Sequence, residues 1–381
     1  LVKIGVVTEY FPKSEKAELR GGAEARAFHV AKQLAKKQEV VVIASRERGT
    51  PEEDEFLGIK VFRHGKKREY SQKGSLVGRL SFIVEEEKTL EKFDIVDGYN
   101  FISYPVAWRI SRRQGIPAIA TYHDVWLGKW VKNIGPSGVL GEILERYVLS
   151  RKWEKFIAVS GYTRDRLVEV GVKKNRIEII PSGVDLSLFE EIKTEKYREP
   201  TICCIARLVD YKHVDDLIRA LELVKNEIPN IKCKIIGSGP EERKLRALVK
   251  GLNLRENVEF LGFIKEHRQV IRILKSSHVF CLPSTVEGLG LVVVEAMAAG
   301  VPFVVSELPA LVETTGRKGG LFFKPLKYKD LADKLLLVLK DRKVQRALIR
   351  EGTRQAKKYD WEILVKKIEK VYNDVMAIKK G

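Results

Sequence analysis

The sequence predicts an α/β protein built from two Rossmann-like domains, and three observations support this fold class. A length of 381 residues with 44% hydrophobic side chains is enough for two separate cores. Short β-branched and aromatic runs alternate with helical patterns through most of the chain. The alternation restarts at Thr201, after a charged segment at 191–200 that ends in proline and suits a linker. We therefore expect one domain over residues 1–185 and a second over 186–360.

In the first domain, strands are expected where runs of Val, Ile, Phe and Tyr are bounded by polar or glycine residues. Helices are expected where apolar residues recur at helical spacing, as at Ala27, Val30 and Leu34. The segment 46–73 contains an acidic PEEDE and a basic GKKRE, so much of it should lie on exposed loops. The expected strands are 2–8, 39–45, 59–64, 94–97, 117–122, 156–160 and 177–180. The expected helices are 23–37, 82–90, 107–114, 141–153 and 160–171.

The second domain repeats the pattern, and its stretch 277–307 is a complete strand, loop, helix and strand. Pro283 ends the first of these strands, and Gly300-Val301-Pro302 ends the helix in the usual way. Two further segments, LPALVETTG and GGLFFKP, complete the domain. The expected strands are 201–206, 232–236, 258–264, 278–282 and 303–306. The expected helices are 215–227, 291–299, 329–339, 344–358 and 361–376.

Composition narrows the class of protein. No apolar run approaches the ~20 residues that a membrane span needs, and the four cysteines lack metal-ligand spacing. We expect these cysteines to be buried, reduced core thiols of a cytoplasmic protein. The chain opens on a strand-like run, so we expect no signal peptide and an initiating residue before Leu1. A charged content of 32%, rich in Lys, Arg and Glu, is typical of a thermophile.

The net charge of +19 has three interpretations: a nucleic-acid partner, an anionic membrane surface, or polyphosphate ligands. No nucleic-acid motif accompanies the charge and the basic residues are spread over most helices, so no nucleic acid is expected. The segment 126–155 combines Trp126, Trp130 and Trp153 with several basic residues. It is either a helix packed on the sheet with solvated lysines or a surface that touches lipid headgroups. Peripheral contact with an anionic membrane is therefore one expectation.

Two carboxylates bracket the loop and helix of the stretch 277–307. Glu287 stands just before the helix and Glu295 lies inside it, with Gly288 and Gly290 between them. The N–H groups at the start of the helix can face an anion. Glu287 can accept a hydrogen bond from a sugar hydroxyl, and Glu295 can reach a ribose diol. This arrangement suits a nucleotide sugar; the alternative is a pair of ordinary solvated glutamates.

Two cations, Arg207 and Lys212, are either ordinary surface residues or groups that stabilise a leaving diphosphate. Transfer from a nucleotide sugar releases a diphosphate whose growing charge must be stabilised. Metal-dependent transferases commonly use an Asp-x-Asp motif, which this chain lacks, so we expect no metal and no other cofactor. Arg207 and Lys212 lie between a strand and a helix, where a guanidinium fork and a mobile ammonium can take the metal's place.

Polar residues also follow two strands of the first domain. Gly21 and Gly22 open a helix and allow a ligand to approach the backbone closely. His123 ends a strand, at the sheet edge where open α/β sheets place their chemistry. Asp124 either orients the imidazole or faces an acceptor, and Trp126 opens the loop that follows.

The string EGLGLVVVEAMAAGVP at 287–302 resembles the signature of the retaining family-four glycosyltransferases (glycosyl transferases group 1), which have the two-domain GT-B fold. RLVDYK at 207–212, TYHD at 121–124 and GGAE at 21–24 fit the same family. Leu289 stands where the family often has Phe. Ser182, in PSGVD, stands where the family typically has Asn, so no side-chain contact is carried over to it.

The resemblance implies that two domains face each other across a cleft and that the last helix, within 361–381, returns to the first domain. The catalytic residues would then be His123, Glu287, Arg207 and Lys212, with His123 meeting the donor sugar. Asp124 and Trp126 would face the acceptor. The residues expected to bind the donor are Gly21, Gly22, Gly237, Gly262, Phe263, Gly288, Leu289, Gly290, Leu291 and Glu295.

The function that the resemblance implies is retaining, metal-independent transfer of a glucose-, mannose- or N-acetylglucosamine-type hexose. The donor would be a nucleoside-diphosphate sugar such as a UDP-sugar or GDP-mannose. The acceptor would be a hydroxyl on a sugar, a lipid-linked compound or a small molecule. No carboxylate nucleophile is evident, so front-face attack assisted by the leaving phosphate is expected. The alternatives are a GT-B epimerase or phosphorylase, a sugar-nucleotide sensor and a basic nucleic-acid-binding protein.

Overall fold

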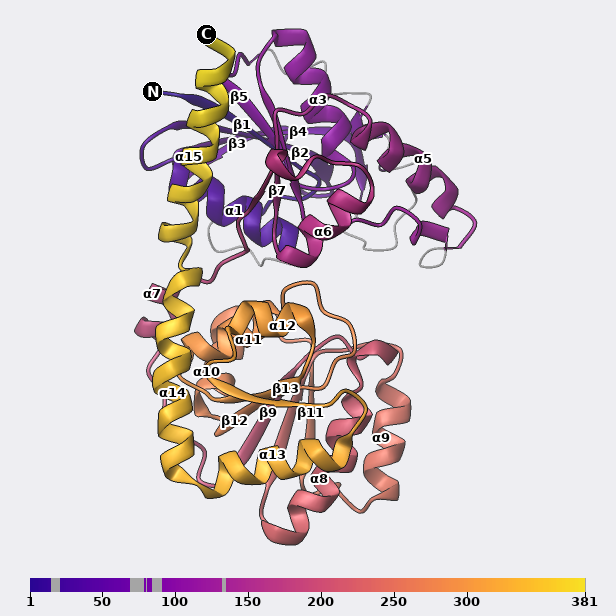
Figure 1. The fold of residues 1–381 in the computed structure, drawn as a ribbon, viewed down its shortest axis with the longest axis vertical. Coiled ribbons are helices and arrows are strands. Elements are labelled where there is room, and N and C mark those ends of the chain that lie inside the picture. The colour runs from indigo at the N-terminus through magenta and orange to yellow at the C-terminus, as the bar shows by residue number, and fades with distance from the viewer. Residues whose placement is uncertain (15–20, 69–78, 80, 84–90, 132–134, 381) are drawn as a thin grey trace. The chain divides into compact units, whose positions relative to one another are not determined.

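The computed structural model describes residues 1–14, 21–68, 79, 81–83, 91–131 and 135–380. The chain forms two compact units, each built around its own sheet (Figure 1). Unit 1 comprises Leu1–Ser182 and Trp361–Gly381, and unit 2 comprises Gly183–Asp360. The sequence analysis placed this boundary at residue 185 and assigned 361–381 to the first domain.

Unit 1 contains an eight-stranded sheet in the order β3-β4-β2-β1-β5-β6-β7-β8. All neighbouring strands are parallel except β3 and β4. The strand order reverses between β1 and β5, so polar residues after these two strands meet at one edge. The strands are β1 (Lys3–Thr8), β2 (Glu39–Glu47), β3 (Glu53–Phe56), β4 (Ile59–Arg68), β5 (Ile95–Gly98), β6 (Ala118–Tyr122), β7 (Lys155–Ala158) and β8 (Ile177–Ile179).

One expectation for unit 1 is wrong. The acidic segment was expected on a loop, but Glu53–Phe56 is an edge strand that pairs antiparallel with β4. Leu57 and Gly58 join the two strands, and both have positive φ angles of 55° and 71°. This is the backbone that a two-residue hairpin needs. Alternate β3 residues are half-buried, which a run of acids does not signal.

Helices cover both faces of the unit 1 sheet. The helices α1 (Gly22–Leu34) and α15 (Trp361–Lys380) pack on one face. The helices α3 (Ser103–Gln114), α5 (Gly138–Leu149) and α6 (Gly161–Glu169) contribute to the core on the other face. A short 3-10 turn, Lys174–Arg176, precedes β8. The helix expected at 82–90 lies mostly outside the described residues.

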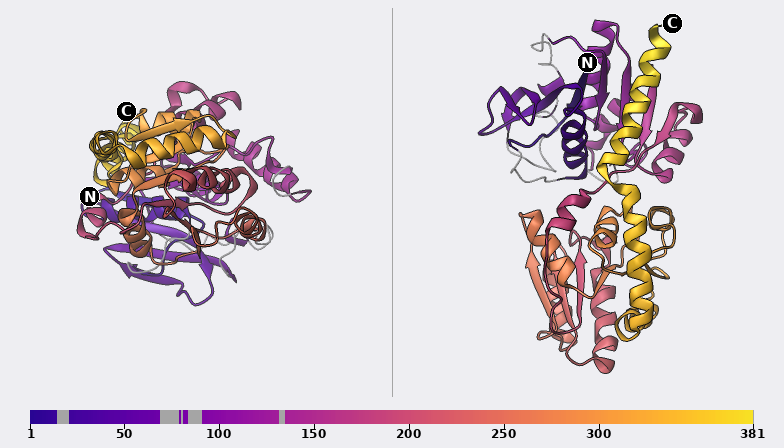
Figure 2. Two further views of the ribbon diagram at one scale, coloured as in Figure 1. Left: turned by 90° about the horizontal axis from the view of Figure 1, so that it is seen from below. Right: turned by 90° about the vertical axis from the view of Figure 1, so that its left-hand side faces the viewer.

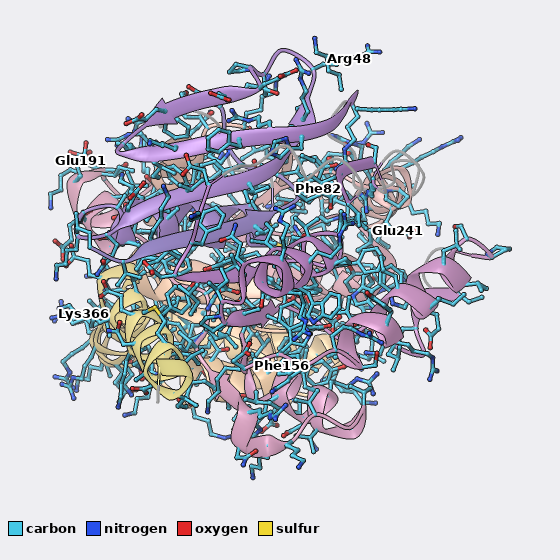
Figure 3. The ribbon with its side chains drawn as sticks, turned by 90° about the horizontal axis from the view of Figure 1, so that it is seen from above. Arg48, Phe82, Phe156, Glu191, Glu241 and Lys366 are labelled. Carbon is cyan, nitrogen blue, oxygen red and sulfur yellow. The ribbon has the colours of Figure 1, made fainter. Side chains whose placement is uncertain are left out.

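The last helix, α15, runs along unit 1 beside α1 (Figure 2). Its buried side chains include Leu364, Ile368 and Tyr372, which recur at helical spacing and join the core beneath α1. Lys366 points outward from the other side of the helix (Figure 3). The chain therefore returns to unit 1 at its end and completes that unit's core.

Unit 2 contains a six-stranded parallel sheet in the order β11-β10-β9-β12-β13-β14. Its order reverses between β9 and β12. The strands are β9 (Thr201–Ile205), β10 (Lys232–Ile236), β11 (Val258–Gly262), β12 (Val279–Leu282), β13 (Phe303–Ser306) and β14 (Gly320–Phe323). The four cysteines are free and buried in β9, β10 and β12, as expected.

Both faces of this second sheet are also covered. The helices α8 (Val214–Glu227), α9 (Glu242–Gly251) and α13 (Tyr328–Lys340) line one face. The helices α10 (His267–Ser276), α11 (Leu291–Ala298) and α12 (Pro309–Thr315) line the other. The remaining helices are α7 (Leu186–Glu191), α14 (Arg342–Ala356) and two 3-10 turns, at Asp210–Lys212 and Lys357–Tyr359. The sequence analysis did not predict α9 and α10.

Candidate functional site

The candidate site of unit 2 lies at the carboxyl ends of β9 and β12, the two neighbouring strands between which the sheet order reverses. Loops after such strands leave the sheet in opposite directions and open a crevice where ligands bind. The β9 loop carries Arg207 and Lys212, and the β12 loop carries Glu287. Residues that are far apart in sequence therefore reach one place because of the strand order.

Backbone contacts hold the β9 loop in place. The N–H of Leu208 donates to the carbonyl oxygen of Ser238 over 3.0 Å, and the N–H of Glu241 donates to that of Leu208 over 3.0 Å. A Cβ on Gly237 would lie 1.9 Å from the carbonyl oxygen of Ala206, and one on Gly239 would lie 2.2 Å from that of Leu208. Both glycines are thus required for close packing against the loop that carries Arg207, whose side chain is exposed.

Lys212 ends a 3-10 turn at Asp210–Lys212 and pairs with Glu287. Its Nζ donates to Oε1 of Glu287 over 2.6 Å, and both side chains are largely buried. The N–H of Thr285 donates to the carbonyl oxygen of Tyr211 over 2.9 Å, which ties the two loops together beside the pair. A cation and an acid that the sequence analysis gave separate roles therefore form one ion pair.

The helix α11 begins directly after this loop. Gly290 is its N-cap with φ 73° and ψ 49°, and a Cβ there would meet Leu311 at 2.3 Å. Oγ1 of Thr314 donates to the carbonyl oxygen of Leu289 over 2.7 Å and holds the turn from the α12 side. The unpaired N–H groups of a first helical turn, with the positive end of the helix dipole, favour an anion at this position.

Glu295 lies one turn further along α11 and contacts a residue that the sequence analysis missed. Its Oε1 lies 3.0 Å from Nε2 of His267 on α10. Burial lowers the pKa of His267, but the hydrogen bond and charge of Glu295 outweigh it, so the net effect is a raised pKa. No motif pointed to His267, because its place beside Glu295 depends on the packing of α10 against α11.

Gly262 ends β11 and Phe263 follows it, at the far side of β10 from β9. Gly262 has a φ of 68°, and nothing lies within 4 Å of a Cβ built on it. The Phe263 side chain is 62% exposed. The N–H of Gly237 donates to the carbonyl oxygen of Gly262 over 2.8 Å. This turn is therefore connected to the glycine loop, the segment after β10 that contains Gly237 and Gly239 and supports the loop carrying Arg207.

In unit 1, His123 directly follows β6, and its backbone is fixed by α6. Oγ1 of Thr163 donates to the His123 carbonyl oxygen over 3.3 Å, while Ser160 caps α6 by accepting from the Thr163 N–H. The Nε2 atom of His123 is buried without a partner among the described residues. Burial, together with the charge of Arg26, lowers the pKa of His123 to about 3. The imidazole is therefore neutral near pH 7.

Arg26 is the second residue that the sequence analysis missed. It lies on α1, one turn after Gly21 and Gly22, and its side chain is fully buried. Its Nη1 donates to Oγ of Ser182 over 3.5 Å, and its guanidinium lies 6.0 Å from the centre of the Trp361 ring. An arginine on the apolar stripe that contains Val30 was a visible signal, because such a position normally holds an apolar side chain.

The proposed acceptor residues lie on the loop after β6. Oδ1 of Asp124 accepts from the N–H of Val125 over 2.8 Å, and burial raises the pKa of this carboxyl group. The N–H of Trp126 donates to Glu145 over 3.2 Å, and its ring packs 5.0 Å from that of Trp130. Both residues therefore belong to a loop held by α5.

Most of the chain is similar to known proteins. Residues 20–188 match the family model described as Glycosyltransferase Family 4, and residues 188–355 match the model described as Glycosyl transferases group 1. An uncharacterized glycosyltransferase of Methanocaldococcus jannaschii is 25% identical over 398 residues, with 99% of each chain covered. A GDP-mannose-dependent monoacylated alpha-(1-6)-phosphatidylinositol monomannoside mannosyltransferase of Corynebacterium glutamicum is 30% identical over 233 residues, 56% of this chain and 60% of that protein.

Solved structures show the same fold. Sucrose-phosphate synthase from Thermosynechococcus elongatus superposes with a TM-score of 0.81 at 20% identity, covering 99% of this chain and 100% of that one. Anabaena HepE in complex with UDP and glucose superposes with a TM-score of 0.74 at 18% identity, covering 98% and 100%. Two doubly wound units with these neighbours define the GT-B class of proteins. Within it, the chain belongs to the group 1 and family 4 glycosyltransferases and is a hexosyltransferase.

None of the helices in the described parts of the chain is both long enough and apolar enough to span a bilayer.

Proposed function

We propose that this enzyme transfers a glucose-, mannose- or N-acetylglucosamine-type hexose from a nucleoside-diphosphate sugar to a hydroxyl acceptor. Transfer would proceed with retention of the anomeric configuration and without a metal ion. The observation that carries the proposal is the Lys212–Glu287 pair, 2.6 Å apart on the loops of β9 and β12 and next to the start of α11. It supplies a cation, a hydroxyl-binding acid and a helix N-terminus at one point.

The leaving diphosphate is the group that these residues would stabilise. An incoming phosphate competes with Glu287 for the Lys212 ammonium, and Arg207 on the same loop adds an exposed guanidinium. Charge-assisted hydrogen bonds from these groups are short and strong, and they form without a metal. Once Lys212 turns to the phosphate, Glu287 is released to accept from a sugar hydroxyl. Glu295 would hold the ribose after exchanging its His267 contact for the diol.

The reaction breaks the bond between the anomeric carbon and the phosphate oxygen and forms one from that carbon to the acceptor oxygen. The acceptor proton would pass to the departing phosphate oxygen on the same face of the sugar. His123 is neutral near pH 7, so it would hydrogen-bond a donor hydroxyl and would not act as a charged acid. The acceptor would be a sugar, a lipid-linked compound or a small molecule that binds near Asp124 and Trp126.

The test is a thermal-shift panel of UDP-, GDP- and ADP-sugars, followed by product analysis with the best binder. Lys212→Ala and Glu295→Ala should each lower the transfer rate by about 10²- to 10³-fold, because each removes a charged group from the site. The matched control is Lys340→Ala on α13. It removes the exposed ion-pair partner of Glu227, which lies at the end of α8 opposite to the Lys212 loop. Near-normal rates in both site variants would overturn the residue assignment.

Binding of a nucleotide sugar without turnover would instead indicate a sensor. Metal independence is tested by measuring the glycosyl-transfer rate with and without a strong chelator. We expect equal rates, and a loss that added Mg²⁺ or Mn²⁺ restores would contradict the proposed role of Arg207 and Lys212.

A further inference from the structure

The helix α5 of unit 1 is held tightly by one of its faces. Gly138, Gly141, Glu145 and Val148 are buried on that face. A Cβ on Gly141 would lie 2.5 Å from the Trp130 ring, and one on Gly138 would lie 2.5 Å from the Trp130 backbone. Nε1 of Trp130 donates to Oε2 of Glu145 over 2.6 Å. These contacts leave α5 one orientation about its own axis.

The opposite face of α5 carries apolar side chains that this packing turns outward. At about 100° of rotation per residue, Val139, Leu140, Ile143 and Tyr147 lie within a sector of roughly 100°, away from Trp130. Together with the neighbouring Val131, they are between 39% and 59% exposed. Single exposed apolar residues are common. A stripe of four apolar residues along one helix, however, normally packs against the core. An apolar stripe that faces solvent indicates an interaction surface.

The surroundings of this stripe are basic. Lys and Arg outnumber Asp and Glu by six to three within residues 126–155, and one of the acids, Glu145, is buried. The Arg151 guanidinium lies 4.4 Å from the centre of the Tyr147 ring, and Lys152 is exposed next to it. Aliphatic side chains bordered by Arg and Lys are the pattern of a helix that lies in the headgroup region of an anionic bilayer.

The position of α5 suits such a contact. The helix projects from the periphery of unit 1, on the side away from α15 (Figure 1). Of the two interpretations that the sequence left open for 126–155, the packed helix holds for Trp130 and Trp153, which are buried and do not provide the surface. The exposed residues are the aliphatic side chains and Tyr147.

We propose that the surface formed by Val131, Val139, Leu140, Ile143 and Tyr147 docks this enzyme onto an anionic lipid bilayer, with α5 parallel to the membrane plane. As a consequence that rests on the proposed function, the acceptor hydroxyl belongs to a lipid-linked compound in that bilayer. Attraction between the basic rim and anionic headgroups brings the protein to the surface, and burial of the aliphatic side chains holds it there.

The test is co-sedimentation of the full chain with vesicles of phosphatidylcholine alone or of phosphatidylcholine with phosphatidylglycerol. The wild type should bind the anionic vesicles, and added salt should weaken this binding. The double variant Leu140→Gln/Ile143→Gln should bind about tenfold or more weakly, because two aliphatic anchors are lost. The control Val168→Gln/Leu337→Gln changes two apolar residues of similar exposure on other helices and should bind like the wild type.

Tryptophan fluorescence and nucleotide-sugar binding verify that each variant is folded. Wild-type protein that ignores anionic vesicles, or a Leu140/Ile143 variant that binds as well as the wild type, would overturn the proposal. Reversible self-association that the same double substitution abolishes, without vesicle binding, would assign the surface to a second copy of the chain and also overturn it. Vesicle binding without glycosyl transfer would leave the docking surface standing and would contradict only the proposed function.

Discussion

At the scale of single residues, the structure places a buried charge cluster in the centre of unit 1. Asp97 on β5 is fully buried, accepts from Oγ1 of Thr121 over 3.0 Å and accepts from the hydroxyl of Tyr372 over 2.7 Å. Burial raises the pKa of Asp97 to about 7, although hydrogen bonds from Tyr372 and Thr121 and the charge of Arg26 oppose the rise. This carboxyl group therefore titrates near neutral pH.

We predict a pH-dependent effect of Asp97→Asn. The folded-state pKa of Asp97 lies above its ordinary value of 3.8, so between about pH 4 and pH 7 the folded state retains a proton that the unfolded state releases. The wild type thus loses stability from this group as pH rises through that window. The variant should gain stability relative to the wild type over the same window, by on the order of a few kcal/mol.

Urea unfolding followed by tryptophan fluorescence measures this effect, because all five tryptophans lie in unit 1. His123 acts in the opposite direction, since its lowered pKa makes unit 1 less stable as pH falls below 6.5. Glu145 acts in the same direction as Asp97, because burial raises its pKa to about 7. The stability of the wild type should therefore fall more steeply with rising pH than that of the variant. Asp165→Asn, on the exposed surface of α6, is the control. Parallel profiles for the wild type and Asp97→Asn would show that the carboxyl group does not titrate in this range.

At the scale of elements, the loops around the unit 2 site depend on each other. The glycine loop after β10 supports the β9 loop, and the β9 loop presents Arg207 and Lys212. Gly237 has a φ of 131°, which adds backbone strain to any substitution there. The sequence analysis treated Gly237 as a donor-binding residue, and the structure gives it a packing role that needs no ligand.

We predict that Gly237→Ala destabilises unit 2 by about 2–4 kcal/mol and weakens nucleoside-diphosphate binding. The new Cβ would displace Ala206, and Arg207 would move with it. Calorimetric unfolding and titration with a nucleoside diphosphate measure the two effects. Gly251→Ala in α9 is the control, because nothing lies within 4 Å of its Cβ. It should be neutral or stabilising by up to about 1 kcal/mol. Equal behaviour of the two variants would contradict the supporting role of the glycine loop.

At the scale of the whole molecule, one chain builds two units and returns to the first. The return is made by α15, whose Tyr372 hydroxyl donates to Asp97 and lies 3.4 Å from that of Tyr99. The end of the sequence thus completes a polar cluster that begins on α1 and β5. The cleft between the units, expected from the family resemblance, stays a prediction.

We predict that Tyr372→Phe lowers the free energy of unfolding of unit 1 by about 1–3 kcal/mol, because a buried carboxyl group loses its donor. Nucleoside-diphosphate affinity should change less than twofold, since Arg207, Lys212 and Glu295, the side chains proposed to bind it, belong to unit 2. Tryptophan fluorescence in urea reports the first quantity and titration calorimetry the second. Tyr162→Phe, at a half-exposed position of α6, should change neither. A large loss of nucleoside-diphosphate affinity, with no change in the free energy of unfolding of unit 1, would contradict this separation of stability in unit 1 from binding in unit 2.

Much of the fold was predictable from the sequence, because strand and helix patterns are local. The helix that begins at Leu291 and the strand Phe303–Ser306 were predicted because Pro283, Gly300 and Pro302 mark their limits. The hairpin of β3 and β4 was not predicted, because β3 is acidic and half-exposed and lacks the apolar alternation of a buried strand. The identities of Arg207, Lys212, Glu287 and Glu295 as candidate residues came from motifs that are contiguous in sequence.

By itself, then, the sequence determined the α/β class, the two repeats of strand and helix, the buried thiols and the residue types that the loop before α11 carries. Only the tertiary structure decided that Lys212 pairs with Glu287, that Arg26 and Tyr372 approach Asp97, and that the aliphatic face of α5 points to solvent. The physical reason is the distance along the chain over which each effect acts. Propensity and periodicity act over a few residues, whereas strand order and the rotation of a helix about its axis depend on packing between segments far apart in the chain.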